Sequence, residues 1–179
     1  GDGYDDILIG AYAADPGGVS GSGETYVVFG STTGPSGIIN LIVSGVDEDD
    51  YSGYSVSTAG DMNGDGYDDI LIGAYAADPG GDSYAGKTYV VFGKASFTSS
   101  VDLSTLDGTN GFVLEGIDAG DFSGYSVSEA GDVNGDGYAD ILIGTLGADP
   151  GGVSDSGETY VVFGKSESFA ASVDLGSLD

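Results

Sequence analysis

The residues best suited to chemistry in this chain are oxygen-bearing side chains at alternate positions of a short loop. The loop lies in the stretch GDMNGDGYDDILIG, residues 60–73, directly before an apolar run. Alternate residues around a tight loop direct side-chain oxygens inward, and a backbone carbonyl can serve at position 7. Hard oxygen ligands in that number suit Ca²⁺ better than Mg²⁺. We therefore predict a calcium site whose positions 1, 3, 5, 7 and 9 are Asp61, Asn63, Asp65, Tyr67 and Asp69.

The same loop recurs, which argues against an accident of composition. GDVNGDGYADILIG at 131–144 repeats the whole pattern, and GDGYDDILIG opens the chain with its second half. Position 8 is Asp5, Asp68 and then Ala139, so a carboxylate there is dispensable. The partial copy at the start is either empty or completed by residues outside this chain. We predict a second calcium site at Asp132, Asn134, Asp136, Tyr138 and Asp140, and a partial site at Asp2, Tyr4 and Asp6.

A plain hairpin turn is the alternative interpretation of NGDG, because Asn-Gly and Asp-Gly are strong turn signals. A turn explains two residues and leaves the spaced carboxylates on both sides unexplained. Gathering those carboxylates without a cation would also cost on the order of several kcal/mol if they were desolvated. The loop differs from an EF-hand, because position 12 is Ile72 or Ile143 in a predicted strand and no flanking helix is expected.

The composition excludes several other kinds of chemistry. The 179 residues carry 30 acidic side chains, three Lys and a net charge of −27, and they contain no Cys or His. Arg and Trp are also absent. A Ser-His or Cys-His nucleophile pair and a thiolate or imidazole zinc site are therefore ruled out. Binding to nucleic acid or to an anionic membrane surface would be opposed electrostatically. No apolar run is long enough for a membrane-spanning helix, and we expect no signal peptide.

Repeats of this loop organise the chain. Its copies at 1, 64 and 135 are spaced by 63 and 71 residues, and the TYVVFG block follows each of them. Short runs rich in β-branched and aromatic residues, separated by Gly- and Pro-containing turns, predict four strands per period and no helices. This is the pattern of an all-β protein built from β-propeller blades of four antiparallel strands. We expect one repeat region over 1–179, with a partial blade at 1–39, blades at 40–107 and 108–170, and the start of a next repeat at 171–179.

The first and last residues both lie inside a repeat. The chain begins at the fourth position of the acidic loop, and SVDLGSLD at its end matches SVDLSTLD at 100–107. Three repeats are also fewer than the four to eight blades of typical propellers. We expect this chain to be a piece of a longer propeller or repeat array, and assembly of several copies is the alternative. Both interpretations expose β edges on the isolated chain.

The motif combination resembles the FG-GAP repeat of integrin α-subunit propellers and their bacterial relatives. The FG half is represented by SGYSVS at 52–57 and 123–128, and the GAP half by IGAYAADPGG at 72–81. Ser52 and Ser123 precede the Gly of the first half, and Thr145-Leu146 replaces Ala-Tyr in the third copy; neither departure touches a proposed ligand. The resemblance covers nearly the whole chain. It implies a propeller of four-stranded blades with calcium between the first two strands of a blade, and a role in extracellular adhesion and recognition.

Three functional hypotheses remain. The first is a calcium-binding, non-catalytic module, extracellular or at the cell surface, whose partners are calcium ions, other copies or further repeats, and an extracellular protein or glycan. The second is a polysaccharide-acting enzyme with paired carboxylates. The third is a lectin-like module in which Tyr12, Tyr75 or Tyr84 stacks on sugar. Asp15, Asp78 and Asp149 in the ADPGG segments are expected to be turn residues. The main acids that break the repeat symmetry are Glu48, Asp49, Asp50 and Asp82.

Overall fold

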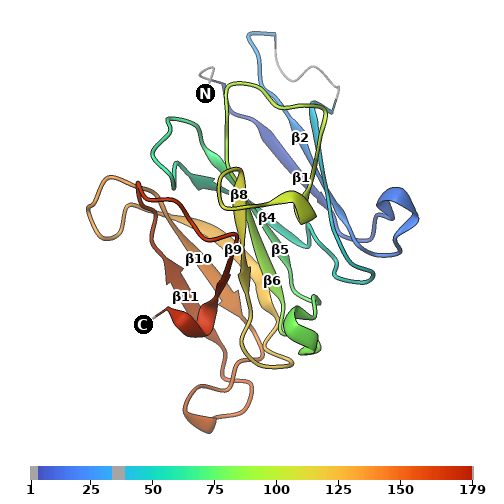
Figure 1. Ribbon diagram of the computed structural model, residues 1–179, viewed down its shortest axis with the longest axis vertical. Helices are drawn as coiled ribbons and strands as arrows, with labels where there is room; N and C mark the ends of the chain where they lie inside the picture. The colour runs from blue at the N-terminus through green and yellow to red at the C-terminus, as the bar shows by residue number, and fades with distance from the viewer. Residues whose placement is uncertain (1–3, 34–38, 179) are drawn as a thin grey trace.

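Three mostly antiparallel sheets make up the described part of the chain, and two of them gain a short strand from a later part of the sequence. The computed structural model describes residues 4–33 and 39–178, and within them it contains strands and short 3₁₀ turns but no α-helix. Figure 1 shows the sheets side by side, from the blue N-terminal sheet through the green middle sheet to the orange and red third sheet. This arrangement confirms the all-β prediction and the series of propeller blades.

The middle sheet is the most complete blade. Its strand order is β12-β8-β6-β5-β4, in which β4, β5, β6 and β8 pair antiparallel; the sequence predicted four antiparallel strands per blade. The short β12 adds to β8 in parallel. The strands are β4 (Ser55–Gly60), β5 (Asp69–Ala74), β6 (Lys87–Val91), β8 (Gly111–Glu115) and β12 (Ser172–Asp174).

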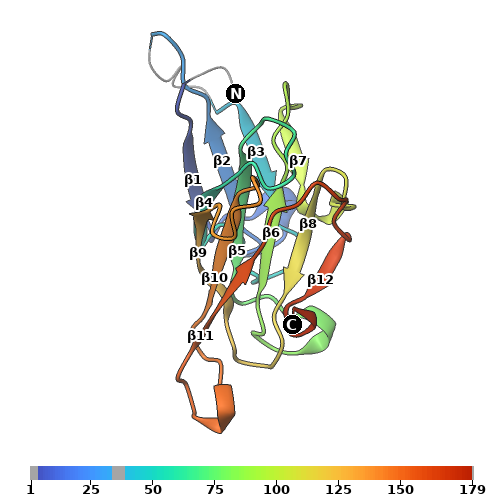
Figure 2. The same cartoon turned by 90° about the vertical axis from the view of Figure 1, so that its left-hand side faces the viewer.

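The two outer sheets repeat parts of this pattern. The first sheet has the order β1-β2-β3-β7, with β7 parallel to β3, and the third has the order β11-β10-β9. Figure 2 shows the strands of the sheets running in similar directions along the length of the molecule. The first sheet contains β1 (Ile7–Ala11), β2 (Glu24–Val28), β3 (Leu41–Ser44) and β7 (Ser100–Asp102), and the third contains β9 (Ser123–Gly131), β10 (Asp140–Thr145) and β11 (Glu158–Val162).

The pairing of β3 and β8 groups the strands differently from the expected blade boundaries. The boundaries at 39/40 and 107/108 assigned each of these strands to the start of the following blade. In the structure β3 pairs with β2 and β8 pairs with β6, so each strand closes the sheet that precedes it in the chain. The SVDL segments, which the sequence matched to one another without assigning structure, form the parallel strands β7 and β12. Each of these is followed by a 3₁₀ turn, η3 (Leu103–Thr105) or η5 (Leu175–Ser177).

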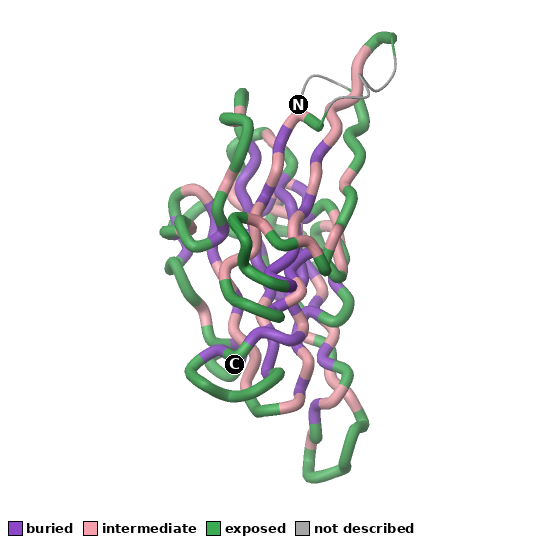
Figure 3. The backbone as a smooth tube through the Cα atoms, turned by 90° about the vertical axis from the view of Figure 1, so that its right-hand side faces the viewer, coloured by how far each residue is buried: buried purple, intermediate pink, exposed green. Residues whose placement is uncertain are grey.

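Two apolar cores lie between neighbouring sheets. Successive side chains of a strand point to opposite faces, so β5 serves both cores: Ile70 and Ile72 pack toward the first sheet, and Leu71 packs toward the third. All six residues of β5 are buried. The tube in Figure 3 shows the buried segments concentrated inside the molecule and the loops at its ends exposed. The middle sheet is therefore covered on both faces, and the outer sheets are each covered on one.

Candidate metal-binding loops

Each complete acidic loop joins the first two strands of a blade. The loop 61–68 leaves β4 and enters β5, and the loop 132–139 leaves β9 and enters β10. The first strand of each pair carries the SGYSVS motif, and the second carries the apolar DILIG motif. The two loops therefore lie at the same end of their sheets, because they occupy the same position in the repeat.

The carboxylate at position 1 organises the loop from inside. Asp61 accepts hydrogen bonds from the backbone N–H of Asp65 at Oδ1 (3.0 Å) and of Gly66 at Oδ2 (2.9 Å). Asn63 Oδ1 accepts a second bond from the Asp65 N–H, at 2.9 Å. Asp65 Oδ1 in turn accepts from the Tyr67 N–H at 2.9 Å. The backbone of the loop is thus wrapped around the oxygen atoms of positions 1, 3 and 5.

The second loop repeats these contacts one for one. Asp132 accepts from the N–H of Asp136 at 3.0 Å and of Gly137 at 2.9 Å. Asn134 Oδ1 accepts from the Asp136 N–H at 2.9 Å, and Asp136 Oδ1 accepts from the Tyr138 N–H at 3.0 Å. The two loops differ in sequence at Val133 and Ala139 within this stretch, yet these four hydrogen bonds are the same. Asp132 Oδ1 also accepts from the Gly135 N–H at 2.7 Å, a bond that the first loop does not repeat. The oxygen-bearing positions therefore define the loop conformation.

Position 9 plays a different part, because its carboxylate is buried beneath the loop. Asp69 accepts from the N–H of Met62 at 3.0 Å and from the N–H of Gly93, beyond the end of β6, at 2.8 Å. Burial raises the pKa of Asp69 to about 7, with the charges of Asp65 and Asp61 acting in the same direction, while the bonds from Gly93 and Met62 oppose the rise. A buried carboxylate with a raised pKa is one that a cation would return to its charged form.

The same bond to the third strand occurs in all three repeats. Asp140 accepts from the Gly164 N–H at 2.9 Å, and Asp6 of the partial loop accepts from the Gly30 N–H at 2.8 Å. Tyr4 and Asp6 are exposed, and Asp2 lies outside the described residues. The three carboxylates at position 9 therefore tie the start of the second strand of each blade to the end of the third.

The donor set fits a hard cation, although the side chains are not gathered into a coordination shell. Among the described residues, no group of three or more acidic side chains is close enough together to hold a metal ion as it stands. Each oxygen of Asp61 accepts one backbone bond, and a carboxylate oxygen has two lone pairs, so acceptor capacity remains. Asp65 and Asp136 are exposed, whereas Asp69 and Asp140 are buried. Oxygen ligands alone, without nitrogen or sulfur, suit Ca²⁺.

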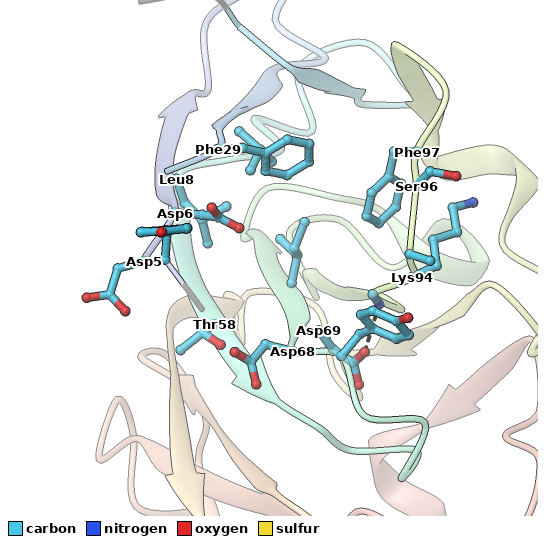
Figure 4. A pocket seen from close by; sticks show the side chains of 16 residues that line it. Asp5, Asp6, Leu8, Phe29, Thr58, Asp68, Asp69, Lys94, Ser96 and Phe97 are labelled. Atoms are coloured by element: carbon cyan, nitrogen blue, oxygen red, sulfur yellow. Dashed lines mark hydrogen bonds between the residues drawn. The ribbon is translucent and has the colours of Figure 1, made fainter. Parts of the chain in front are cut away.

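A pocket of about 540 Å³ opens beside the first complete loop, between the first and middle sheets. Figure 4 shows Asp5 and Asp6 on one side of it, Asp68 and Asp69 on another, and the rings of Phe29 and Phe97 facing the space. At the next junction, Met62 is fully buried against the third sheet.

An aromatic surface cluster lies at the opposite end of the sheets. Tyr54 precedes β4 and Tyr75 follows β5, so both lie at the end of these strands away from the acidic loop. Their ring centroids are 4.5 Å apart, and the Tyr54 hydroxyl donates to that of Tyr125 at 3.2 Å. Several of the rings are well exposed. The aromatic surface cluster consists of Tyr12, Tyr51, Tyr54, Tyr75, Tyr84, Phe122 and Tyr125.

Sequence reasoning found only part of this cluster. It singled out Tyr12, Tyr75 and Tyr84 as candidate rings, and the structure brings them into one connected group. It missed the contribution of the SGYS segments, whose Tyr54 and Tyr125 lie in the centre. The signal was available in the repeat itself, since a ring that recurs at the same position of adjacent blades must lie near its own copy.

The acids outside the loops mostly have structural partners. In the three ADPGG segments, Asp15, Asp78 and Asp149 accept from the N–H of Gly21, Tyr84 and Asp155, at 2.7, 2.7 and 2.6 Å. These bonds confirm the prediction that they are turn residues. Asp50 was predicted to be one of the acids that break the repeat, but it has a counterpart in Asp121. It is buried, and burial raises its pKa to about 6 while the Lys87 charge opposes the rise. No helix among the described residues is long and apolar enough to cross a membrane.

The fold and the loops together define a propeller blade with an acidic loop between its first two strands, and comparison with known proteins identifies the repeat family. Residues 52–91 and 123–162 match the FG-GAP repeat family. The chain therefore carries FG-GAP repeats, and each matched segment runs from the SGYSVS strand through the acidic loop to the TYVV strand.

The relatives found in the comparison are integrin α chains. Integrin alpha-5 of Xenopus laevis is 32% identical over 152 residues, which cover 83% of this chain. Integrin alpha-PS2 of Drosophila melanogaster is 30% identical over 185 residues, which cover 100% of this chain. Human integrin alpha-IIb is 30% identical over 155 residues. The aligned region covers only 13–14% of these relatives, so the chain corresponds to a small part of each of them.

Proposed function

We propose that this chain is part of a calcium-stabilised, non-catalytic β-propeller module that acts outside the cell in adhesion, recognition or structural assembly. The observation that carries the proposal is the duplicated acidic loop, in which positions 1, 3 and 5 share the same four backbone hydrogen bonds in both copies. The similarity to integrin α chains supports a role at the cell surface.

The ligands we assign are the side-chain oxygens of positions 1, 3, 5 and 9 and the backbone carbonyl of position 7. The complete sites are Asp61, Asn63, Asp65, Tyr67 and Asp69, and Asp132, Asn134, Asp136, Tyr138 and Asp140. The partial site is Asp2, Tyr4 and Asp6. Bound calcium would offset the repulsion among the three carboxylates of each loop. Calcium sites of extracellular modules often have dissociation constants of about 10⁻⁴–10⁻³ M, a range matched to calcium levels outside cells.

The test is isothermal calorimetry with calcium on wild type and loop variants. Wild type should bind two ions per chain, and Asp65→Ala or Asp136→Ala should each remove one. Asp68→Ala is the matched control, because it removes an acidic residue of the same loop at the position where the other copy has Ala139. Unchanged stoichiometry in Asp65→Ala and Asp136→Ala would refute the ligand assignment, and loss of an ion in Asp68→Ala would indicate a general charge effect.

A second candidate function is carbohydrate recognition at the aromatic surface cluster. Exposed Tyr rings combine an apolar face with a hydroxyl, a combination suited to the faces and hydroxyl groups of sugars. The hydrogen bond between Tyr54 and Tyr125 holds two of these rings at the surface. Glycan-array binding that is lost in Tyr75→Ala and survives Asp136→Ala would support this function. An array without signal for the wild-type chain would leave protein partners as the ligands to examine.

The polysaccharide-acting enzyme has weaker support. The acids of the three ADPGG segments are engaged in turns, and the charge nearest in effect to Asp50 is that of Lys87. Turnover of an acidic or neutral polysaccharide by the purified chain would contradict the non-catalytic assignment.

A further inference from the structure

The side chains of this protein that oxidise readily are almost all tyrosines. The sequence contains no Cys, no Trp and one Met, against 12 Tyr. The one methionine, Met62, is fully buried in the core between the middle and third sheets. Sulfur side chains are common sites of oxidation, but their reaction requires access to the oxidant. A one-electron oxidant that meets the folded chain therefore reacts with tyrosine.

Two of the tyrosines meet hydroxyl to hydroxyl at the junction of the middle and third sheets. Tyr54 directly precedes β4, and Tyr125 lies in β9. The Tyr54 hydroxyl donates to that of Tyr125 at 3.2 Å, while the ring centroids are 5.2 Å apart at an interplanar angle of 45°. Because the hydroxyls are closer together than the centroids, the two rings converge toward the ends that carry the ortho carbons. Both sheets are part of this chain, so the contact depends on no residue outside it.

Oxidants can reach this pair directly and through neighbouring rings. Tyr54 and Tyr125 are each 38% exposed. The ring of Tyr75 contacts both of them, with centroids 4.5 Å and 5.6 Å away, and Tyr12 lies 5.4 Å from Tyr54. Phenol rings in contact exchange electrons, so a radical formed elsewhere in the aromatic surface cluster can also migrate to the pair.

We propose that Tyr54 and Tyr125 form a modification site, where hydrogen peroxide and a haem peroxidase join the two rings into a dityrosine cross-link. This goes beyond the proposed function, because it depends neither on calcium nor on an adhesion partner. The pair is favoured over the contacts with Tyr75, because its rings converge at their hydroxyl ends whereas Tyr75 meets both rings edge to face, at 62° and 73°.

The coupling needs only an oxidant that removes single electrons. Each phenol loses one electron and its hydroxyl proton, which leaves two phenoxyl radicals whose unpaired electrons are shared between the oxygen and the ortho carbons. The two unpaired electrons then form a bond between one Cε atom of each ring. The hydrogen on each of these carbons moves as a proton to the oxygen of its own ring and restores the phenol. In total two electrons and two protons leave the protein, and they reduce one hydrogen peroxide to two water molecules.

The cross-link would hold two adjacent blades together by a covalent bond. Tyr54 and Tyr125 are 71 positions apart in the sequence, so the bond closes a long loop. Closing such a loop lowers the conformational entropy of the unfolded chain and favours the folded state. Disulfides cannot supply this constraint here, because the sequence contains no Cys.

The experiment treats the 179-residue chain, at low protein concentration, with a haem peroxidase and hydrogen peroxide. Dityrosine fluorescence and the intact mass report coupling, and mass spectrometry of the digested monomer identifies the linked peptides. Tyr54→Phe and Tyr125→Phe each remove one hydroxyl and keep the ring, so both variants should keep the wild-type circular dichroism spectrum. Tyr84→Phe is the matched control, because Tyr84 is 52% exposed in the same cluster and its ring packs on Phe122, which has no hydroxyl and cannot couple.

The wild type and Tyr84→Phe should yield a monomer lighter by two hydrogen atoms, with a link between the peptides of Tyr54 and Tyr125. Tyr54→Phe and Tyr125→Phe should each lose this product, and with it most of the dityrosine fluorescence of the monomer. Dityrosine found only in cross-linked dimers, or a monomer linked through other tyrosines, would overturn the proposal. The cross-linked monomer should also have a higher urea midpoint than the untreated chain, and an unchanged midpoint would refute its role in holding the blades together.

Discussion

The two complete acidic loops have nearly the same sequence and share four internal hydrogen bonds, but their surroundings differ. The loop 61–68 is covered by the third sheet: Asp61 O accepts from the Ala139 N–H at 3.1 Å, and Met62 O accepts from the Lys165 N–H at 2.8 Å. The loop 132–139 has no blade beyond it in the described chain, and Val133 is exposed where Met62 is buried. The conformation of the loop is therefore determined by its own residues, while the contacts that cover it come from the next blade.

Calcium removal should have the largest effect, because it acts on both loops at once. A site filled at about ten times its dissociation constant contributes about 1.4 kcal/mol, so two such sites contribute about 3 kcal/mol. Chelation should then lower the melting temperature by roughly 5–10 °C. Differential scanning calorimetry in calcium and in EGTA measures the shift. An equal shift with magnesium would show that the loops do not select for the larger ion.

The difference in support predicts different affinities for the two loops. The site that remains in Asp136→Ala is the covered loop 61–69, and the site that remains in Asp65→Ala is the uncovered loop 132–140. Because a supported loop loses less conformational freedom on binding, the first variant should bind calcium a few times more tightly than the second. Calorimetric titration of both variants gives the ratio. A ratio of one would mean that the neighbouring blade does not influence the site.

Substituting Ala for Gly at the fourth position of each loop distinguishes the cost of backbone strain from the cost of a clash with the neighbouring blade. Gly64 and Gly135 have φ values of 74° and 79°, so Ala in either position should lose about 1 kcal/mol of stability from backbone strain alone. A Cβ at Gly64 would also come within 2.5 Å of Tyr138 Cε1, whereas a Cβ at Gly135 meets nothing within 4 Å. Urea denaturation should therefore show a larger loss for Gly64→Ala. Equal losses would contradict the close contact between the blades.

Asp50 provides a smaller, pH-dependent comparison at the aromatic end of the same two junctions. Asp50 is near Lys87, Asp47, Asp78 and Tyr89, while its repeat counterpart Asp121 is near Glu158 instead of a Lys. Burial raises the pKa of Asp50 from its ordinary 3.8 to about 6. A raised carboxyl pKa favours the folded state at low pH, and this stability is lost as the pH rises through about 6.

The change Asp50→Asn removes this titration. The variant should be more stable than wild type by about 1 kcal/mol at pH 7.5, and this advantage should shrink as the pH falls below 6 and be lost near pH 4, measured by urea denaturation in EGTA. The variant Asp121→Asn is the parallel test. Burial also raises the pKa of Asp121, so its stability relative to wild type should change with pH in the same direction. A pH-independent difference between wild type and Asp50→Asn would indicate a packing effect rather than titration.

The strands could be predicted from the sequence because the same strand motifs recur in each repeat. DILIG and TYVV form β5 and β6 of the middle sheet, and the same motifs form β10 and β11 of the third. Repetition also located the acidic loops, whose spaced oxygens define their own hydrogen bonds. Local pattern was enough in both cases because the contacts are between residues close together in the chain.

The features that the sequence did not reveal depend on contacts between repeats. The strand β3 follows a turn-rich segment, and only its pairing with β2 shows that it closes the first sheet. The parallel additions of β7 and β12 link segments far apart in the chain. Likewise, Tyr54 and Tyr125 are 71 residues apart and meet only because adjacent blades stack. The length of the repeat and its composition do not show which residues of different repeats come into contact.

The most direct measurement of the central claim is the number of calcium ions bound by each chain, counted by native mass spectrometry across a calcium titration. We expect two ions per monomer, filling the loops at 61–69 and 132–140. A third ion that appears only in an oligomer would show that a neighbouring chain completes the partial site of Asp2, Tyr4 and Asp6. No bound ion at millimolar calcium would contradict the account and reduce both acidic loops to turns.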